Sequence, residues 1–181
     1  MLFLETMFVI LFLLIGFGFL TFGFDALFGK LDFVSSNFAL EKALVIIKDR
    51  KLDGGSFFDL GSCRGSFAAK MAKKLPQLHV RGIDDSWFRT LCASIRSTFL
   101  KNADFSQGNI FTTNVSSADI VYLYLPQELM PELENKLQKE LKPGSLVISN
   151  SVSFPSWQAS ESFILQPNNP LSRKLFVYAK I

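Results

Sequence analysis

Residues 59–65 read Asp59-Leu60-Gly61-Ser62-Cys63-Arg64-Gly65 and stand between two different patterns. Residues 56–60, which overlap the start of this stretch, form a short apolar run of the kind that makes a buried strand. The residues after them, Phe67 to Leu75, have helical spacing that ends before Pro76. Glycines at positions 61 and 65 favour a tight connection. The stretch therefore predicts a strand, a glycine turn and a helix.

The same alternation continues on both sides of this unit. Before it, Ser35-Ser36-Asn37 offer N-cap side chains to a helix that ends near Asp53-Gly54-Gly55. After it, strands and helices alternate, and the last two strands are joined by a turn-rich segment with no room for a crossover helix. This order predicts an α/β fold whose parallel sheet is covered on both faces and carries an antiparallel strand pair at its edge. The further predicted strands are 79–83, one near 105, 119–124, 145–149, 162–165 and 175–179, and the further predicted helices hold residues 88–99 and 131–141.

The N-terminus predicts a membrane anchor. Met7 to Phe24 contains no charged residue, and as a helix it would rise about 27 Å, close to the hydrocarbon thickness of about 30 Å. A cleaved signal peptide would have basic residues before this run and a small-residue cleavage site after it. The first basic residues follow the run, so the positive-inside rule places the rest of the chain in the cytoplasm. We expect a single-pass membrane protein with a transmembrane anchor at 1–24, a juxtamembrane linker at 25–34 and one domain at 35–181.

The composition agrees with this division. The chain has 181 residues, of which 49% are hydrophobic and only 19% are charged. Once the N-terminal segment is set aside, the remainder has the size of one ordinary domain. A net charge of +3 is too small to favour a nucleic-acid partner. Cys63 and Cys92 fit no metal or disulfide spacing, which indicates a reducing compartment, and Cys92 is predicted in the core on the apolar face of its helix.

The glycine turn and an acid on the next strand predict a ligand site. Asp84 ends the second strand, and ligands of such sheets bind outside the carboxyl ends of the strands. Gly61 and Gly65 let a ligand approach the backbone, and Asp84 can accept hydrogen bonds from ribose hydroxyls. The Asp59 carboxylate would repel a pyrophosphate and attract an ammonium group, which favours S-adenosylmethionine over a dinucleotide. The alternative is that the glycines serve only the conformation of the turn.

The segment Asp59 to Gly65 resembles the first motif, D-x-G-x-G-x-G, of the class I S-adenosylmethionine-dependent methyltransferases. The resemblance implies their Rossmann-like, seven-stranded sheet with a C-terminal antiparallel strand pair, preceded here by one transmembrane helix. It also implies which residues contact the cofactor. Asp59, Gly61, Ser62 and Gly65 would line its methionine half, Asp84 would bind its ribose, and Asn109 and Ile110 stand where the superfamily contacts adenine.

A later block narrows the resemblance. The later part of the chain is similar to the small membrane-anchored protein-lysine methyltransferases in residues 118–126, 131–144, 147–149 and 154–157. This family includes the mitochondrial enzymes that modify the adenine nucleotide translocase and the ATP synthase c-subunit, together with prokaryotic relatives. The resemblance implies a protein substrate beside the membrane, and the bilayer as a partner of residues 7–24. Tyr124, Leu125 and Pro126 are the candidates for the substrate loop. The tyrosines of this strand are also compatible with a purely strand-forming role.

Two other functions stay open. Cys63 stands where the family has its second motif glycine, Arg64 stands where an acid commonly follows, and Asn150 replaces a frequent histidine. These departures leave a catalytically silent binding or scaffold protein as an alternative. The small basic surplus leaves a nucleic-acid methyltransferase as another, although the sequence has no clustered basic stripe.

Overall fold

The computed structural model describes residues 2–27, 35–169 and 172–181, with the side chains of the first helix described from residue 4 to residue 19. The chain divides into two compact units, residues 1–32 and residues 33–181. Each unit is described by itself below. Most of the predicted linker at 25–34 lies outside the described residues.

The first unit contains one helix, α1, Leu2–Leu27. Its apolar side chains are exposed, from Leu4 at 62% to Phe19 at 76%. Within the described residues, no helix is long and apolar enough to cross a membrane. The predicted transmembrane span is therefore not supported.

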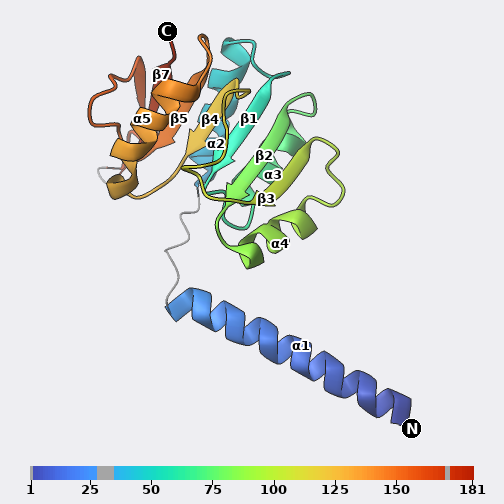
Figure 1. Ribbon diagram of the computed structural model, residues 1–181. Coiled ribbons are helices and arrows are strands. Elements are labelled where there is room, and N and C mark those ends of the chain that lie inside the picture. Colours follow the sequence, from blue (N-terminus) through green and yellow to red (C-terminus); the bar gives the residue numbers. More distant parts are fainter. Residues whose placement is uncertain (1, 28–34, 170–171) are drawn as a thin grey trace. The chain divides into compact units, whose positions relative to one another are not determined.

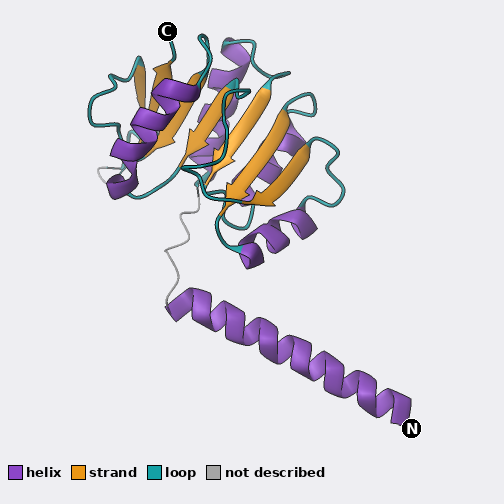
Figure 2. Ribbon diagram, viewed as in Figure 1, coloured by secondary structure: helices purple, strands orange, loops and turns teal. Residues whose placement is uncertain are grey.

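The second unit is built on a seven-stranded sheet in the order β3-β2-β1-β4-β5-β7-β6, and Figures 1 and 2 show its helices on both faces. The first five strands pair in parallel. β7 lies antiparallel between β5 and β6, which confirms the predicted antiparallel pair at the edge. The strands are β1 Ser56–Leu60, β2 His79–Asp84, β3 Ala103–Gln107, β4 Ile120–Leu123, β5 Leu146–Asn150, β6 Glu161–Ile164 and β7 Lys174–Ala179.

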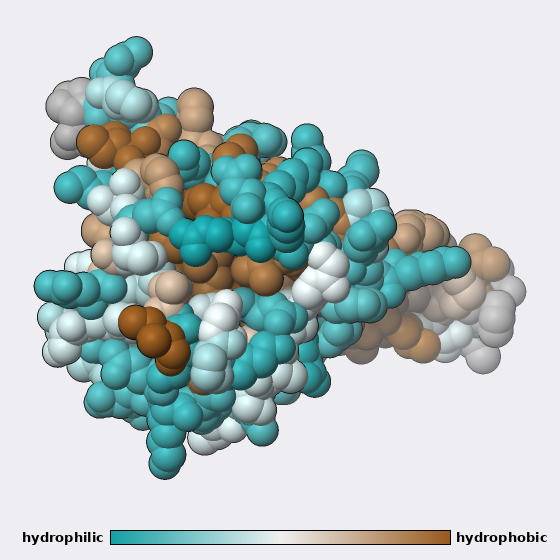
Figure 3. Space-filling view, turned by 90° about the horizontal axis from the view of Figure 1, so that it is seen from above, coloured by the Kyte–Doolittle hydropathy of each residue, from teal (hydrophilic) through white to brown (hydrophobic). Residues whose placement is uncertain are grey.

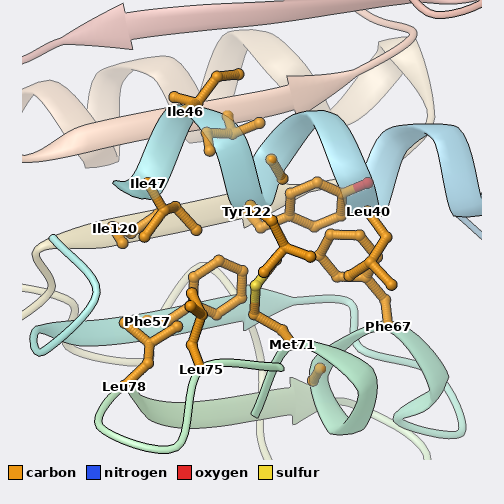
Figure 4. Close-up of a cluster of buried hydrophobic side chains, with 14 of the residues drawn as sticks. Leu40, Ile46, Ile47, Phe57, Phe67, Met71, Leu75, Leu78, Ile120 and Tyr122 are labelled. Atoms are coloured by element: carbon orange, nitrogen blue, oxygen red, sulfur yellow. The ribbon is translucent and has the colours of Figure 1, made fainter. Parts of the chain in front are cut away.

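The sheet divides the core into two layers, one on each of its faces. α2 and α3 cover the first layer, in which Phe57, Met71 and Tyr122 are fully buried (Figure 4). α5 covers the second, around Leu133 and Leu137. Both layers lie inside residues 33–181, so this unit has a complete core of its own. The helices are α2 Asn37–Asp49, α3 Ser66–Lys74, α4 Trp87–Arg96, the 3-10 helix η1 Gln127–Leu129 and α5 Met130–Glu140.

Local chemistry sets where these helices begin. The Ser36 side chain accepts a hydrogen bond from the backbone of Ala39, as the predicted N-cap requires, and Ser86 caps α4 in the same way. Cys92 departs from its prediction, since it is only half-buried. The reason is the orientation of α4, whose Arg89 and Ala93 are buried, whereas Leu91 and Ile95 are exposed.

Candidate functional site

The candidate site lies where the winding of the sheet reverses. From β1 the chain crosses to β2 and β3 on one side, and β4 and β5 lie on the other. Loops that leave the two central strands at such a point go opposite ways, and the crevice between them is the usual ligand site of this architecture. Asp59 lies in β1 opposite Gly82 of β2 and Tyr122 of β4. Asp84 is the last residue of β2.

The turn after β1 depends on its two glycines. Gly61 has φ +80° and Gly65 has φ +68°, a region that side chains with a Cβ rarely enter. The backbone N–H groups of Gly61 and Ser62 both donate to the Ile83 carbonyl, at 2.8 and 2.9 Å, and so fix the turn to β2. A methyl group built at Gly61 would lie 2.5 Å from Leu125 Cδ2. The turn therefore brings the backbone against the loop that follows β4.

Asp84 holds the other end of this turn. Its Oδ2 accepts the backbone N–H of Cys63 at 2.9 Å, and its Oδ1 accepts that of Ser86 at 3.0 Å. Burial raises the pKa of Asp84 although both bonds and the nearby Arg89 lower it. Cys63 adopts φ +50°, so the residue in the second glycine position does take the left-handed conformation that a glycine would favour.

Asp59 carries a buried carboxylate. It is 4% exposed, and among the described residues no hydrogen bond to its side chain is found. Burial, together with the negative charge of Asp84, raises the pKa of Asp59 to about 7. A buried acid of this kind costs stability when it ionises alone, and a cationic ligand would relieve that cost. The buried Asp59 carboxylate therefore fits the ammonium group of S-adenosylmethionine.

Asp59 should make the protein less stable as the pH rises. Its pKa is higher in the folded state, about 7, than the 3.8 of the unfolded chain, so the folded state binds the proton more tightly. The stability that this group contributes is complete below about pH 4 and is lost as the pH rises through about 7. Urea unfolding should show that Asp59→Asn removes a slope of up to about 1.4 kcal/mol per pH unit. An unchanged slope in Asp59→Asn, equal to that of an Asp104→Asn control, would contradict this assignment.

A buried polar cluster adjoins Asp59 and was not predicted from the sequence. The Tyr122 hydroxyl lies 2.7 Å from Ser35 Oγ and accepts a hydrogen bond from Asn150 Nδ2 at 3.0 Å. Burial raises the pKa of Tyr122, and the Asp59 charge adds to this effect. The Tyr122 ring stacks on that of Phe67 (Figure 4), and the two ring centroids are 3.9 Å apart. The cluster joins the segment before α2 to the ends of β4 and β5.

The remaining predicted residues lie around the same edge. Tyr124 and Leu125 are nearly buried, and Pro126 caps η1. The Tyr124 hydroxyl accepts a hydrogen bond from the Arg173 guanidinium. The Cζ atom of Arg173 lies 5.2 Å from the centre of the Tyr124 ring. Asn109 is exposed, and its Oδ1 accepts the backbone N–H of Phe111 at 2.8 Å, so this oxygen shapes its own loop. Ile110 packs against the second core layer.

Comparison with known proteins identifies the fold that carries this site. The family model of the ANTKMT methyltransferase domain matches residues 59–161, more than half of the chain. The chain belongs to this family. ANTKMT methyltransferase domains are class I S-adenosylmethionine-dependent methyltransferases, and the match begins at Asp59 and includes Asp84. The predicted family, enzyme class and cofactor are therefore confirmed.

Two relatives illustrate the similarity of this ANTKMT methyltransferase domain to known proteins. A protein-lysine N-methyltransferase of Saccharolobus islandicus (strain REY15A) is 27% identical over 124 residues, which cover 67% of this chain and 76% of the relative. An RNA methyltransferase of Salinibacter ruber, solved with S-adenosyl-L-homocysteine, superimposes with a TM-score of 0.70 at 18% identity, covering 81% of this chain and 92% of that one. At this identity the second likeness concerns the fold.

Proposed function

We propose that this methyltransferase acts on the side-chain nitrogen of a protein lysine. The observation that carries the proposal is the similarity to the protein-lysine N-methyltransferase of Saccharolobus islandicus, which covers 76% of that enzyme. The RNA methyltransferase shares the fold at lower identity and supports no choice of substrate. The mild net charge of +3 also gives little reason to favour a nucleic acid.

The cofactor contacts are proposals that rest on the chemistry of the turn. Asp59 would bind the ammonium group, because its carboxylate is buried and has no donor among the described residues. Gly61, Ser62 and Gly65 would present backbone to the methionine half, and Asp84 would use its remaining lone pairs for the ribose hydroxyls. Ile110 is the better candidate for the adenine, since the Asn109 oxygen is engaged in its own turn.

Bound S-adenosylmethionine supplies an activated methyl group, so the chain mainly has to position the acceptor. The lysine nitrogen must be held at about 3 to 3.5 Å from that carbon and freed of water. In the transfer, the lone pair of this nitrogen would form the new N–C bond, the electrons of the cofactor's C–S bond would stay on its sulfur, and the nitrogen would then release a proton. No side chain of the enzyme has to become covalently attached.

The end of β4 is suited to a neutral lysine. A lysine side chain in water has a pKa of about 10.4 and must lose its proton before it attacks. Tyr124 and Leu125 are nearly buried, and an apolar site disfavours the ammonium form. The Arg173 cation at the Tyr124 hydroxyl acts in the same direction. We therefore propose that Tyr124, Leu125 and Pro126 border the acceptor channel.

Titration calorimetry with S-adenosylmethionine separates the enzyme from a silent scaffold. We expect the natural protein to bind the cofactor, because Cys63 already takes a positive φ and donates its N–H to Asp84. Cys63→Gly should then change the affinity only modestly. Binding that occurs in Cys63→Gly and not in the natural protein would support the scaffold function.

The N-terminal helix carries a second proposal, that the chain associates with a bilayer. The side chains of α1 are apolar and exposed from Leu4 to Phe19, apart from Glu5 and Thr6 and the glycines. An apolar helix surface of this extent requires a nonaqueous partner. We expect the full chain to float with lipid vesicles even at high salt. Recovery of the full chain in the vesicle-free fraction would contradict the proposal.

A further inference from the structure

The amphipathic helix α4 turns its apolar side outward. Trp87, Leu91 and Ile95 recur every four residues and are 49%, 46% and 66% exposed, and Phe99, just beyond the helix, is 95% exposed. We call these four residues the α4 stripe. The opposite side of the helix, with Arg89 and Ala93, is buried. A surface helix normally does the reverse and faces its apolar stripe toward the core.

The packing of α4 explains this orientation. The helix approaches the start of α3 so closely that a methyl group built at Gly65 would lie 2.7 Å from Ala93 Cβ. The ring of Phe105 fills the neighbouring space between Gly65 and Gly82. Only a small side chain fits at this contact, so Ala93 faces inward and Leu91 and Ile95, on the other side of the helix, face solvent.

An exposed stripe of this kind marks an interaction surface. The face of the molecule in Figure 3 is mostly hydrophilic, with apolar atoms gathered in patches. We propose that the α4 stripe inserts into the surface of an anionic lipid bilayer. The inference rests on the proposed membrane association of α1 and adds a second contact, on the catalytic domain itself.

Charge favours lipid as the occupant. From Trp87 to Lys101 the sequence contains no acidic residue, and Arg96 and Lys101 lie exposed near the end of the stripe. A basic amphipathic helix is typical of membrane surfaces, where apolar side chains enter the headgroup layer and cations meet lipid phosphates. Aromatic residues stand at both ends of the stripe, Trp87 and Phe99, and aromatic rings of this kind suit the interface.

The contact would orient the candidate site. β2 ends at Asp84 and α4 begins at Trp87, so α4 starts at the carboxyl edge of the sheet, as Figure 1 also shows. A domain seated on α4 would hold this edge beside the lipid headgroups. The acceptor lysine would then belong to the part of a protein that emerges at the membrane surface.

Vesicle flotation of residues 33–181 tests the stripe without α1, since this unit contains both core layers. We expect the domain to float with vesicles of phosphatidylcholine and phosphatidylglycerol, and to float less with phosphatidylcholine alone. Leu91→Gln/Ile95→Gln should weaken binding by about tenfold or more, because two apolar anchors are lost. Val45→Gln/Ile164→Gln changes two residues of similar exposure, 50% and 55%, and should bind like the natural domain.

Three outcomes would overturn the inference: no flotation of the natural domain, equal binding of both double variants, or a dimer in sedimentation that Leu91→Gln/Ile95→Gln abolishes. Tryptophan fluorescence of the natural domain gives a second readout, which does not depend on whether a variant folds. Trp87 emission should shift to shorter wavelength when vesicles are added, and Trp87→Phe should lose the shift; its absence in the natural domain counts against insertion. Calorimetry with S-adenosylmethionine on the same variants reports the cofactor site separately, so failure of the proposed function is distinguished from failure of the stripe.

Discussion

Asp84→Ala should weaken the binding of S-adenosylmethionine by about 100-fold. The carboxylate holds the turn through the Cys63 N–H at 2.9 Å and the start of α4 through the Ser86 N–H at 3.0 Å. Its removal takes away the proposed ribose contacts and leaves two backbone donors unpaired, and hydrogen bonds to charged groups contribute about 1.5 to 3 kcal/mol each. Titration calorimetry measures the loss.

Asp104→Ala provides the matched control. Asp104 is an acid in the neighbouring strand β3, but its side chain is 69% exposed and its partner is Arg81 at 3.4 Å. An exposed ion pair of this kind contributes little. Equal affinities of Asp84→Ala and Asp104→Ala would remove Asp84 from the cofactor site.

Gly65→Ala should lower the free energy of unfolding by about 3 kcal/mol. At φ +68° an alanine costs about 1 to 2 kcal/mol for the left-handed backbone. Its methyl group would also lie 2.7 Å from both Ala93 Cβ and Phe105 Cε1, and overpacking of this kind costs about 1 to 3 kcal/mol. Urea unfolding of the variant measures the sum.

Gly54→Ala is the corresponding control, because a methyl group there meets nothing within 4 Å and its φ is not positive. We expect this variant to remain within about 0.5 kcal/mol of the natural protein. If Gly65→Ala is as stable as Gly54→Ala, then the close approach of α3, α4 and β3 does not limit the sequence at this turn.

The sheet could be predicted because its signals are local. The run before Asp59, the glycine turn and the proline after Leu75 each determine their own element, and the short link between the last two strands excludes a crossover helix. The place of Asp84 followed from one general property, that ligands bind beyond the carboxyl ends of parallel strands.

The orientation of α4 and the polar cluster around Tyr122 depend on tertiary contacts. The spacing of Leu91, Cys92 and Ile95 shows an apolar side of α4, but the direction in which it faces is set by the fit of Ala93 against Gly65. The cluster of Tyr122, Ser35 and Asn150 joins positions up to 115 residues apart, so no local pattern indicates it. The available signal was a tyrosine and an asparagine at or next to the ends of two otherwise apolar strands, Tyr122 in β4 and Asn150 in β5.

We propose that the site around Asp59 and Asp84 holds S-adenosylmethionine for methyl transfer to a protein lysine. The most direct test is mass spectrometry of host membrane and soluble fractions after incubation with the full chain and cofactor carrying a deuterated methyl group. We predict labelled methyl groups on lysine nitrogens, present with the natural protein and strongly reduced with Asp84→Ala. Label confined to RNA, or lysine label of equal intensity with both proteins, would contradict the account.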